Sequence, residues 1–190
     1  MHEIEPYYQW RDYYIASQDK LSPFYGRKYS ELHFTNQIYN YYIHPQWDFF
    51  GSSTLYGKLL YADYESQFVV IELIGEWNDA VHNDIMEMKR TLIDPLIKRG
   101  INRFILIGEN VLNFHASDDL YYEEWYDDIK EDGGWIIALN FREHVIEEMQ
   151  KSKLHYYLNV GTAYNDFLWR KFKPANLLDA VESMLIRSLH

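Results

Sequence analysis

Short apolar runs alternate with amphipathic segments from residue 55 onward. The runs have the length of β-strands and cover residues 55–61, 68–74, 104–107, 135–139 and 156–160. Between the last four runs, apolar side chains recur at the three- and four-residue spacing of a helix face. Strands and helices that alternate with short connections predict an α/β fold, with a mixed, largely parallel sheet of about five strands and flanking helices.

The segment after the second run has the clearest helical pattern. Its apolar stripe consists of Val81, Ile85, Met88, Leu92 and Leu96, and the residues outside the stripe are Asp84, Glu87 and Lys89. Asn78 or Asp79 is suited to cap the start of this helix, and Gly100 is suited to end it. Because Pro95 cannot donate a backbone hydrogen bond, we expect a kink or a tightened final turn near Asp94.

The remaining elements follow from the same signals. Runs 55–61 and 68–74 are close enough in sequence to form an antiparallel hairpin. Residues 101–107 are almost continuously apolar, which is typical of a central strand covered on both faces, and a polar loop over 109–118 follows them. The other predicted helices run from Ser117 or Asp118 to Gly133, over 142–151, and onward from Pro174.

Residues 1–54 have a different character. They hold aromatic doublets and several Pro and Gly breakers, and no period of two or 3.6 residues persists. We expect a single domain over 1–190, in which 1–54 form an irregular aromatic-rich layer with one short strand at 32–42, and 55–190 form the α/β core. The layer is expected to cover the sheet face that the helices leave open. The alternatives are stacking platforms for a sugar or a peptide, and a homodimer contact.

Composition narrows the function classes. The chain has no cysteine, which excludes a disulfide scaffold, a thiolate metal site and a cysteine nucleophile. Its net charge of -11 repels phosphate backbones and anionic lipid headgroups, so neither nucleic acid nor membrane is an expected partner. Residues 1–6 lack the features of a signal peptide, and no run approaches the roughly 18 apolar residues of a membrane-spanning helix. We therefore expect a cytoplasmic location.

The order of elements over 55–189 resembles the STAS family, the sulphate-transporter and anti-sigma-factor-antagonist domains, and among them the small stand-alone lipid-pocket-type members. The resemblance is carried by the hairpin entry, by Pro95 late in the first helix and by the polar loop 109–118. Regulatory members carry Asp-Ser-Ser/Thr-Gly at the start of the second helix, where a kinase phosphorylates the serine. This chain has Ala-Ser-Asp-Asp at 116–119. The resemblance therefore implies Ser117 as the phosphorylation site, although the acidic pair after it departs from the pattern.

Polar residues gather where the predicted parallel strands end. The candidates for a pocket there are Glu76, Asn78, Glu109, Asn110, His115 and Arg142. In open α/β sheets, ligands bind beyond the carboxyl ends of the strands, so these residues could hold a polar ligand or pair a carboxylate with His115 as general acid and base. The alternative is that such side chains cap helices and close turns. No helix has a His-x-x-x-His or Glu-x-x-His spacing, so neither a metal nor another cofactor is predicted.

The second predicted helix is strongly acidic on its outward face. The residues proposed to contact a partner are Glu123, Glu124, Asp127 and Asp128, and the cation expected among them is Lys130. A solvated acidic face is one explanation, and a docking surface for a basic protein is the other. Our leading hypothesis is a non-enzymatic interaction or regulatory module that uses this helix and the loop before it. The competing hypothesis is a small-ligand-binding protein or enzyme that uses Glu76, Glu109 and His115.

Overall fold

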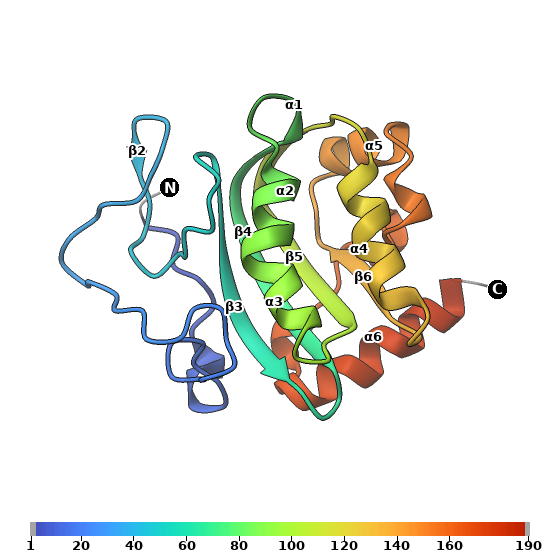
Figure 1. Cartoon of the computed structure of the whole chain (residues 1–190), viewed down its shortest axis with the longest axis horizontal. Coiled ribbons are helices and arrows are strands. Elements are labelled where there is room, and N and C mark those ends of the chain that lie inside the picture. Colours follow the sequence, from blue (N-terminus) through green and yellow to red (C-terminus); the bar gives the residue numbers. More distant parts are fainter. Residues whose placement is uncertain (1–2, 189–190) are drawn as a thin grey trace.

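The computed structural model describes residues 3–188 and contains a mixed four-stranded sheet. The strands lie in the order β3 (Leu55–Asp63), β4 (Phe68–Asn78), β5 (Arg103–His115) and β6 (Trp135–Leu139) (Figure 1). The hairpin β3–β4 is antiparallel, and the pairs β4–β5 and β5–β6 are parallel. The α/β class and the hairpin agree with the sequence prediction, but the sheet has four strands rather than five.

The fifth predicted strand, over 156–160, is reduced to one bridge. Asn159 pairs with Ile137 through two backbone hydrogen bonds, of 2.8 Å to the Ile136 carbonyl and 3.0 Å from the Ala138 N–H. A 3₁₀ turn, η3 (Leu154–Tyr156), lies before this residue, and another, η4 (Thr162–Tyr164), follows it. These turns reorient the chain on both sides of Asn159, so the extended segment cannot propagate into a strand.

The first predicted helix is divided into four segments. They are α1 (Asp79–His82), α2 (Asp84–Met88), the π-helix η2 (Lys89–Ile93) and α3 (Asp94–Ile97). Asn83 has a left-handed backbone with φ of 51° and separates α1 from α2. In η2 the Asp94 N–H bonds to the Lys89 carbonyl, five residues back. A wide turn before Pro95 gives room for a ring that would otherwise clash with the preceding turn, so the helix is widened at the place where a kink or a tightened turn was predicted.

The long strand β5 replaces most of the predicted polar loop 109–118. It runs to His115, which lies opposite Asn78 at the end of the equally long β4. Val111 and Phe114 are buried and anchor this extension. The connection to α4 (Leu120–Lys130) is therefore confined to residues 116–119.

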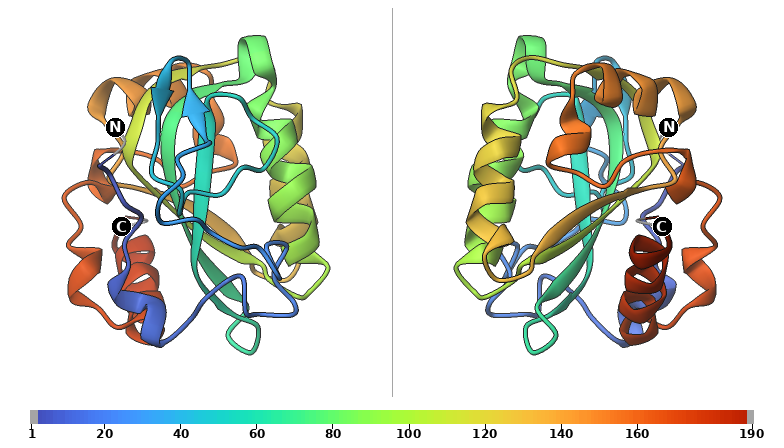
Figure 2. Two further views of the ribbon diagram at one scale, coloured as in Figure 1. Left: turned by 90° about the vertical axis from the view of Figure 1, so that its left-hand side faces the viewer. Right: turned by 90° about the vertical axis from the view of Figure 1, so that its right-hand side faces the viewer.

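Helices cover one face of the sheet, and the C-terminal part of the chain covers the other. The first face packs against α2, α3, α4 and α5 (Glu143–Lys151), as the views in Figure 2 show. The second face packs against α6 (Pro174–Ser188), the turn η5 (Trp169–Lys171) and Trp10 from the 3₁₀ turn η1 (Gln9–Asp12). No helix among residues 3–188 combines the length and apolar character needed to cross a bilayer.

The N-terminal layer lies mainly beside the edge strand β3 (Figure 1). Its predicted strand at 32–42 is instead a hairpin of two-residue strands, β1 (Gln37–Ile38) and β2 (Tyr41–Tyr42). Tyr39 has φ of 55° and reverses the chain between them. The predicted cover of the second sheet face comes from this layer only in part, because the C-terminal segment packs on the same face.

Candidate functional site

The structure distributes the six strand-end candidates over several places. Glu109 and Arg142 border one hollow of about 540 Å³, together with residues 165–171. His115 is exposed and borders a different hollow beside His144 and the acidic side chains of α5. Asn110 is half-buried on β5 opposite Ile74. The strand-end geometry therefore places Glu109 and His115 in separate surroundings.

Glu76 and Asn78 have local structural partners. The Glu76 carboxylate accepts a hydrogen bond of 2.6 Å from the Tyr39 hydroxyl and one of 3.1 Å from the Asn113 amide. Asn78 Oδ1 accepts the Val81 N–H at 3.0 Å and so caps α1. Asn78 thus has the capping role that the sequence left as an alternative, and Glu76 links the β1–β2 hairpin to the sheet.

Glu109 is the centre of the most developed polar network at the strand ends. Its Oε1 accepts hydrogen bonds from Trp169 Nε1 at 2.9 Å, Arg170 Nη1 at 2.9 Å and Asn140 Nδ2 at 3.1 Å. The second guanidinium nitrogen of Arg170 bonds to Oε2. Burial by itself would raise the pKa of Glu109, but these donors outweigh it and hold the pKa below its ordinary value. Glu109 is therefore an ionised partner of Arg170 and is poorly suited to act as a general acid.

Asn140 fixes the segment that closes this hollow. Its side chain accepts the Phe167 N–H at 2.9 Å and donates to the Phe167 carbonyl at 2.9 Å. Asn140 itself has a left-handed backbone with φ of 56°, a conformation that asparagine adopts more readily than most residues. Sequence reasoning missed Asn140, Trp169 and Arg170, because no local spacing relates them to Glu109.

On the acidic helix α4, two of the four predicted contact residues, Glu124 and Asp128, form ion pairs with the π-helix η2. The Lys89 ammonium lies 2.7 Å from Asp128 Oδ2 and 3.4 Å from Glu124 Oε1, and it also bonds to Asp94. Arg90 makes a bidentate contact with Glu124. Lys89 was placed outside the buried stripe by its sequence position, yet its side chain is 0% exposed. The acidic face is thus opposed by Lys89 and Arg90 as well as by Lys130.

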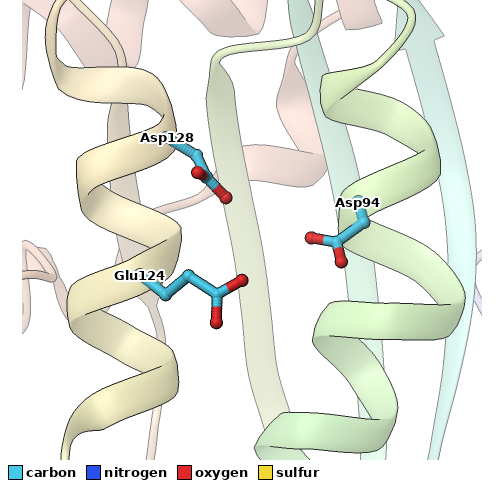
Figure 3. Close-up of side chains that lie close together, drawn as sticks. All are labelled: Asp94, Glu124 and Asp128. Carbon is cyan, nitrogen blue, oxygen red and sulfur yellow. The ribbon is translucent and has the colours of Figure 1, made fainter.

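The carboxylates of Asp94, Glu124 and Asp128 point toward one another from facing helices (Figure 3). Their oxygens lie within 4.8 Å of one another, a spacing that could hold a metal ion. The Lys89 ammonium already contacts all three carboxylates. Because this ammonium supplies the positive charge, a metal ion would have to displace it, and the arrangement is better explained as an ion-pair network between the helices.

The rest of α4 presents a surface of a different kind, in which half of the residues are exposed and half are half-buried. We define the α4 face by Asp119, Leu120, Glu123, Tyr126, Asp127 and Tyr157. The Tyr126 and Tyr157 rings lie 6.3 Å apart, and the Tyr157 hydroxyl donates to Asp119 Oδ2 at 3.1 Å. Desolvation, then the bond to Asp119 and the nearby carboxylates of Glu123 and Asp127, raise the pKa of Tyr157. The aromatic pair is therefore rimmed by carboxylates.

Ser117 is exposed in the loop 116–119, immediately before this face. Leu120 begins α4 with 62% of its surface exposed. The predicted phosphorylation position thus lies beside the predicted contact surface, and both remain predictions.

Similarity to known proteins is found at the level of structure. No family model matches the sequence, and no curated protein matches it. The fold is similar to that of the anti-sigma factor antagonist SpoIIAA in its unphosphorylated form, with a TM-score of 0.49 and 16% sequence identity over 67% of this chain and 96% of that chain. SpoIIAA is an anti-sigma factor antagonist, the class of protein that the element order of this chain resembles. At this identity, residue roles do not carry over from one chain to the other.

Proposed function

We propose that this chain is a non-enzymatic, regulatory interaction module that binds a basic protein partner through the α4 face. The observation that supports it is that one exposed and two half-buried apolar side chains lie beside negative charge. Leu120, Tyr126 and Tyr157 supply apolar area, while Glu123 and Asp127 lie beside them. Protein interfaces commonly combine an apolar centre with a polar rim, and a charged rim selects a partner of opposite sign.

The charge balance of α4 favours Glu123 and Asp127 as the contact residues. Glu124 and Asp128 form ion pairs with Lys89, which also pairs with Asp94, so their negative charges are partly neutralised within the fold. Glu123 makes no ion pair among residues 3–188, and Asp127 pairs only with the exposed Lys130 at 2.6 Å. Two like charges four residues apart on a helix cost about 0.2–0.5 kcal/mol, and a cationic partner would offset that cost.

The network around Glu109 supports a role without turnover. A general acid–base pair needs a titrating group with access to its substrate. Arg170 holds Glu109 ionised, and His115 borders another hollow. The competing proposal of a carboxylate–histidine catalytic pocket therefore has less support than the interaction surface.

Ser117 gives the proposed module a means of control. A phosphate here would add up to two negative charges close to Asp118 and Asp119 and would change the field of the α4 face. In a cytoplasmic setting, which belongs to the proposal, a kinase would then alter the affinity for the partner. A mass increase of one phosphate on Ser117 in protein isolated from its native cells would support this, and its absence under all growth conditions would count against it.

The contact surface is tested by affinity capture with matched variants. We expect Glu123→Gln/Asp127→Asn to lose the partner captured by the wild type, with weaker capture of the wild type at higher salt. The control is Glu143→Gln/Glu147→Gln, which removes two exposed carboxylates at the same spacing from α5. The captured protein is then titrated in purified form against the three chains. Equal binding by the wild type and by both variants would refute the assignment of this surface.

A further inference from the structure

A cavity of about 180 Å³ lies between the N-terminal layer and the edge strand β3. Its wall is largely aromatic and aliphatic, with contributions from Tyr7, Trp10, Tyr14, Tyr29 and Leu60. Lys58 on β3 is among the lining residues, and only 12% of its side chain is exposed. A mostly apolar cavity with one nearly buried cation has the composition of a small-ligand site.

The Lys58 ammonium has weak partners for a buried charge. It lies 3.9 Å from the centre of the Tyr29 ring and 3.4 Å from Asp48 Oδ2, a distance at the long end for an ion pair. Asp48 is shared, because its other oxygen accepts Arg27 Nη1 at 3.0 Å and the Tyr29 hydroxyl at 2.7 Å. The donors of Lys58 are therefore only partly satisfied.

The charges around the cavity do not balance. Of the two cations that line the cavity, Arg11 pairs with Glu5 at 2.8 Å, whereas Lys58 shares the buried carboxylate of Asp48 with Arg27, which lies outside the cavity wall. Glu72 lies opposite Lys58 in the β3–β4 register, but its carboxylate accepts the Tyr7 N–H. Burial lowers the pKa of Lys58, and Asp48 offsets this only in part. One positive charge at the cavity wall thus lacks a full counter-charge.

We propose that this cavity binds a small monocarboxylate with a compact apolar body. The ligand carboxylate accepts charge-assisted hydrogen bonds from Lys58, and its apolar part packs among Tyr7, Trp10 and Tyr14. A cavity of about 150 Å³ is known to hold benzene, so benzoate marks the upper size of ligand that this cavity would accept. The site lies between β3 and the N-terminal layer, and it shares no residue with the α4 face.

The test is calorimetric titration of the full chain with acetate, butyrate and benzoate, and with benzamide as the uncharged match of benzoate. We expect saturable binding of one carboxylate per chain, and benzoate to bind at least about tenfold more tightly than benzamide, because only the anion satisfies Lys58. Lys58→Met keeps the apolar stem and is expected to weaken benzoate binding about tenfold or more. Lys98→Met, at an exposed position after α3, is expected to leave it unchanged.

A second variant separates the contribution of the cavity volume to binding from that of the Lys58 charge. Ala16 is buried and lines the cavity, so Ala16→Leu fills part of its volume and keeps the Lys58 side chain. We expect it to weaken benzoate binding about tenfold or more while acetate binding persists. The proposal is overturned if none of the three carboxylates binds saturably to the wild type, if benzamide binds as well as benzoate, or if folded Lys58→Met or Ala16→Leu protein binds benzoate as the wild type does.

Discussion

A buried carboxylate at the centre of the sheet makes the stability of this protein depend on pH. Glu72 lies on β4 with 2% of its surface exposed, and its Oε2 accepts the Tyr7 N–H at 2.8 Å. Burial raises the pKa of Glu72 from 4.5 to about 7, although the Tyr7 N–H and the charge of Arg170 act in the opposite direction, and Glu109 adds to the rise. The folded protein therefore holds a proton here that the unfolded chain releases.

The sign of the effect follows from proton linkage. A group whose pKa is higher in the folded state contributes its full stability below the unfolded value, near 4.5, and that contribution is lost as the pH rises through about 7. A shift of this size corresponds to roughly 3 kcal/mol between the two limits, since each pKa unit is worth about 1.4 kcal/mol. The wild type is thus penalised at pH 8 by ionising a carboxylate away from water.

Glu72→Gln removes this penalty and keeps an oxygen that can accept the Tyr7 N–H. We expect the free energy of unfolding of the variant, relative to the wild type, to increase by roughly 3 kcal/mol between pH 4 and pH 8. Urea unfolding at a series of pH values measures it. Glu65→Gln, at an exposed position of the same hairpin, controls for the loss of one acidic side chain. A difference between Glu72→Gln and the wild type that is constant from pH 4 to pH 8 would refute the reasoning.

Two further predictions concern the polar networks. Lys89→Met leaves the carboxylates around Lys89 without their buried cation and should lower the free energy of unfolding by about 3 kcal/mol. The exposed change Arg90→Met should cost less than about 1 kcal/mol, both by urea unfolding at pH 7. The loss of stability caused by Lys89→Met should shrink as the pH falls. Partial burial would raise the pKa of Asp94, but its bonds to Lys89 and Arg90 hold that pKa below its ordinary value, and their contribution disappears when the carboxylate is protonated. A loss that does not depend on pH would contradict this prediction. Asn140→Ala removes the side-chain acceptor of the Phe167 N–H, so hydrogen exchange at that amide should accelerate at least about tenfold; unchanged protection at Phe167 would show that other contacts hold the segment.

The elements that the sequence predicts well are those whose apolar residues recur at the regular spacing of a strand or a helix. The strands and helices with alternating or helical apolar positions lie close to where the sequence places them, among them β4, α5 and α6. The extension of β5 could not be found this way, since only Val111 and Phe114 are buried over 109–115, at a spacing of three. The pairing of β5 with β4 shifts register twice, between Glu72 and Ile74 and between Gly75 and Glu76 of β4. These irregularities break the two-residue alternation by which the extension of β5 could have been recognised as a strand.

The site residues were harder to predict because their partners are distant in sequence. Glu109 and Arg170 are 61 positions apart, and Lys89 and Asp128 are 39 positions apart. A lysine at a polar position of a helix is usually solvated, so its complete burial at position 89 follows only from the packing of α4 against η2. Residue type and local spacing identified the acidic helix, but not which of its carboxylates the fold itself neutralises.

The ionisable side chains on the second face of the sheet share one feature. Each is held by a segment outside the sheet: Lys58 by Asp48, Glu72 by the Tyr7 N–H, and Glu109 by Arg170. An apolar face alone would accept the N-terminal and C-terminal segments in several positions, because apolar contacts are not directional. A buried polar or charged group favours the position that supplies its hydrogen-bond partner, because it is costly to leave such a group unpaired. We therefore infer that these three residues fix where the outer segments lie on the sheet, and that the cavity lined by Lys58 and the hollow lined by Glu109 result from this placement.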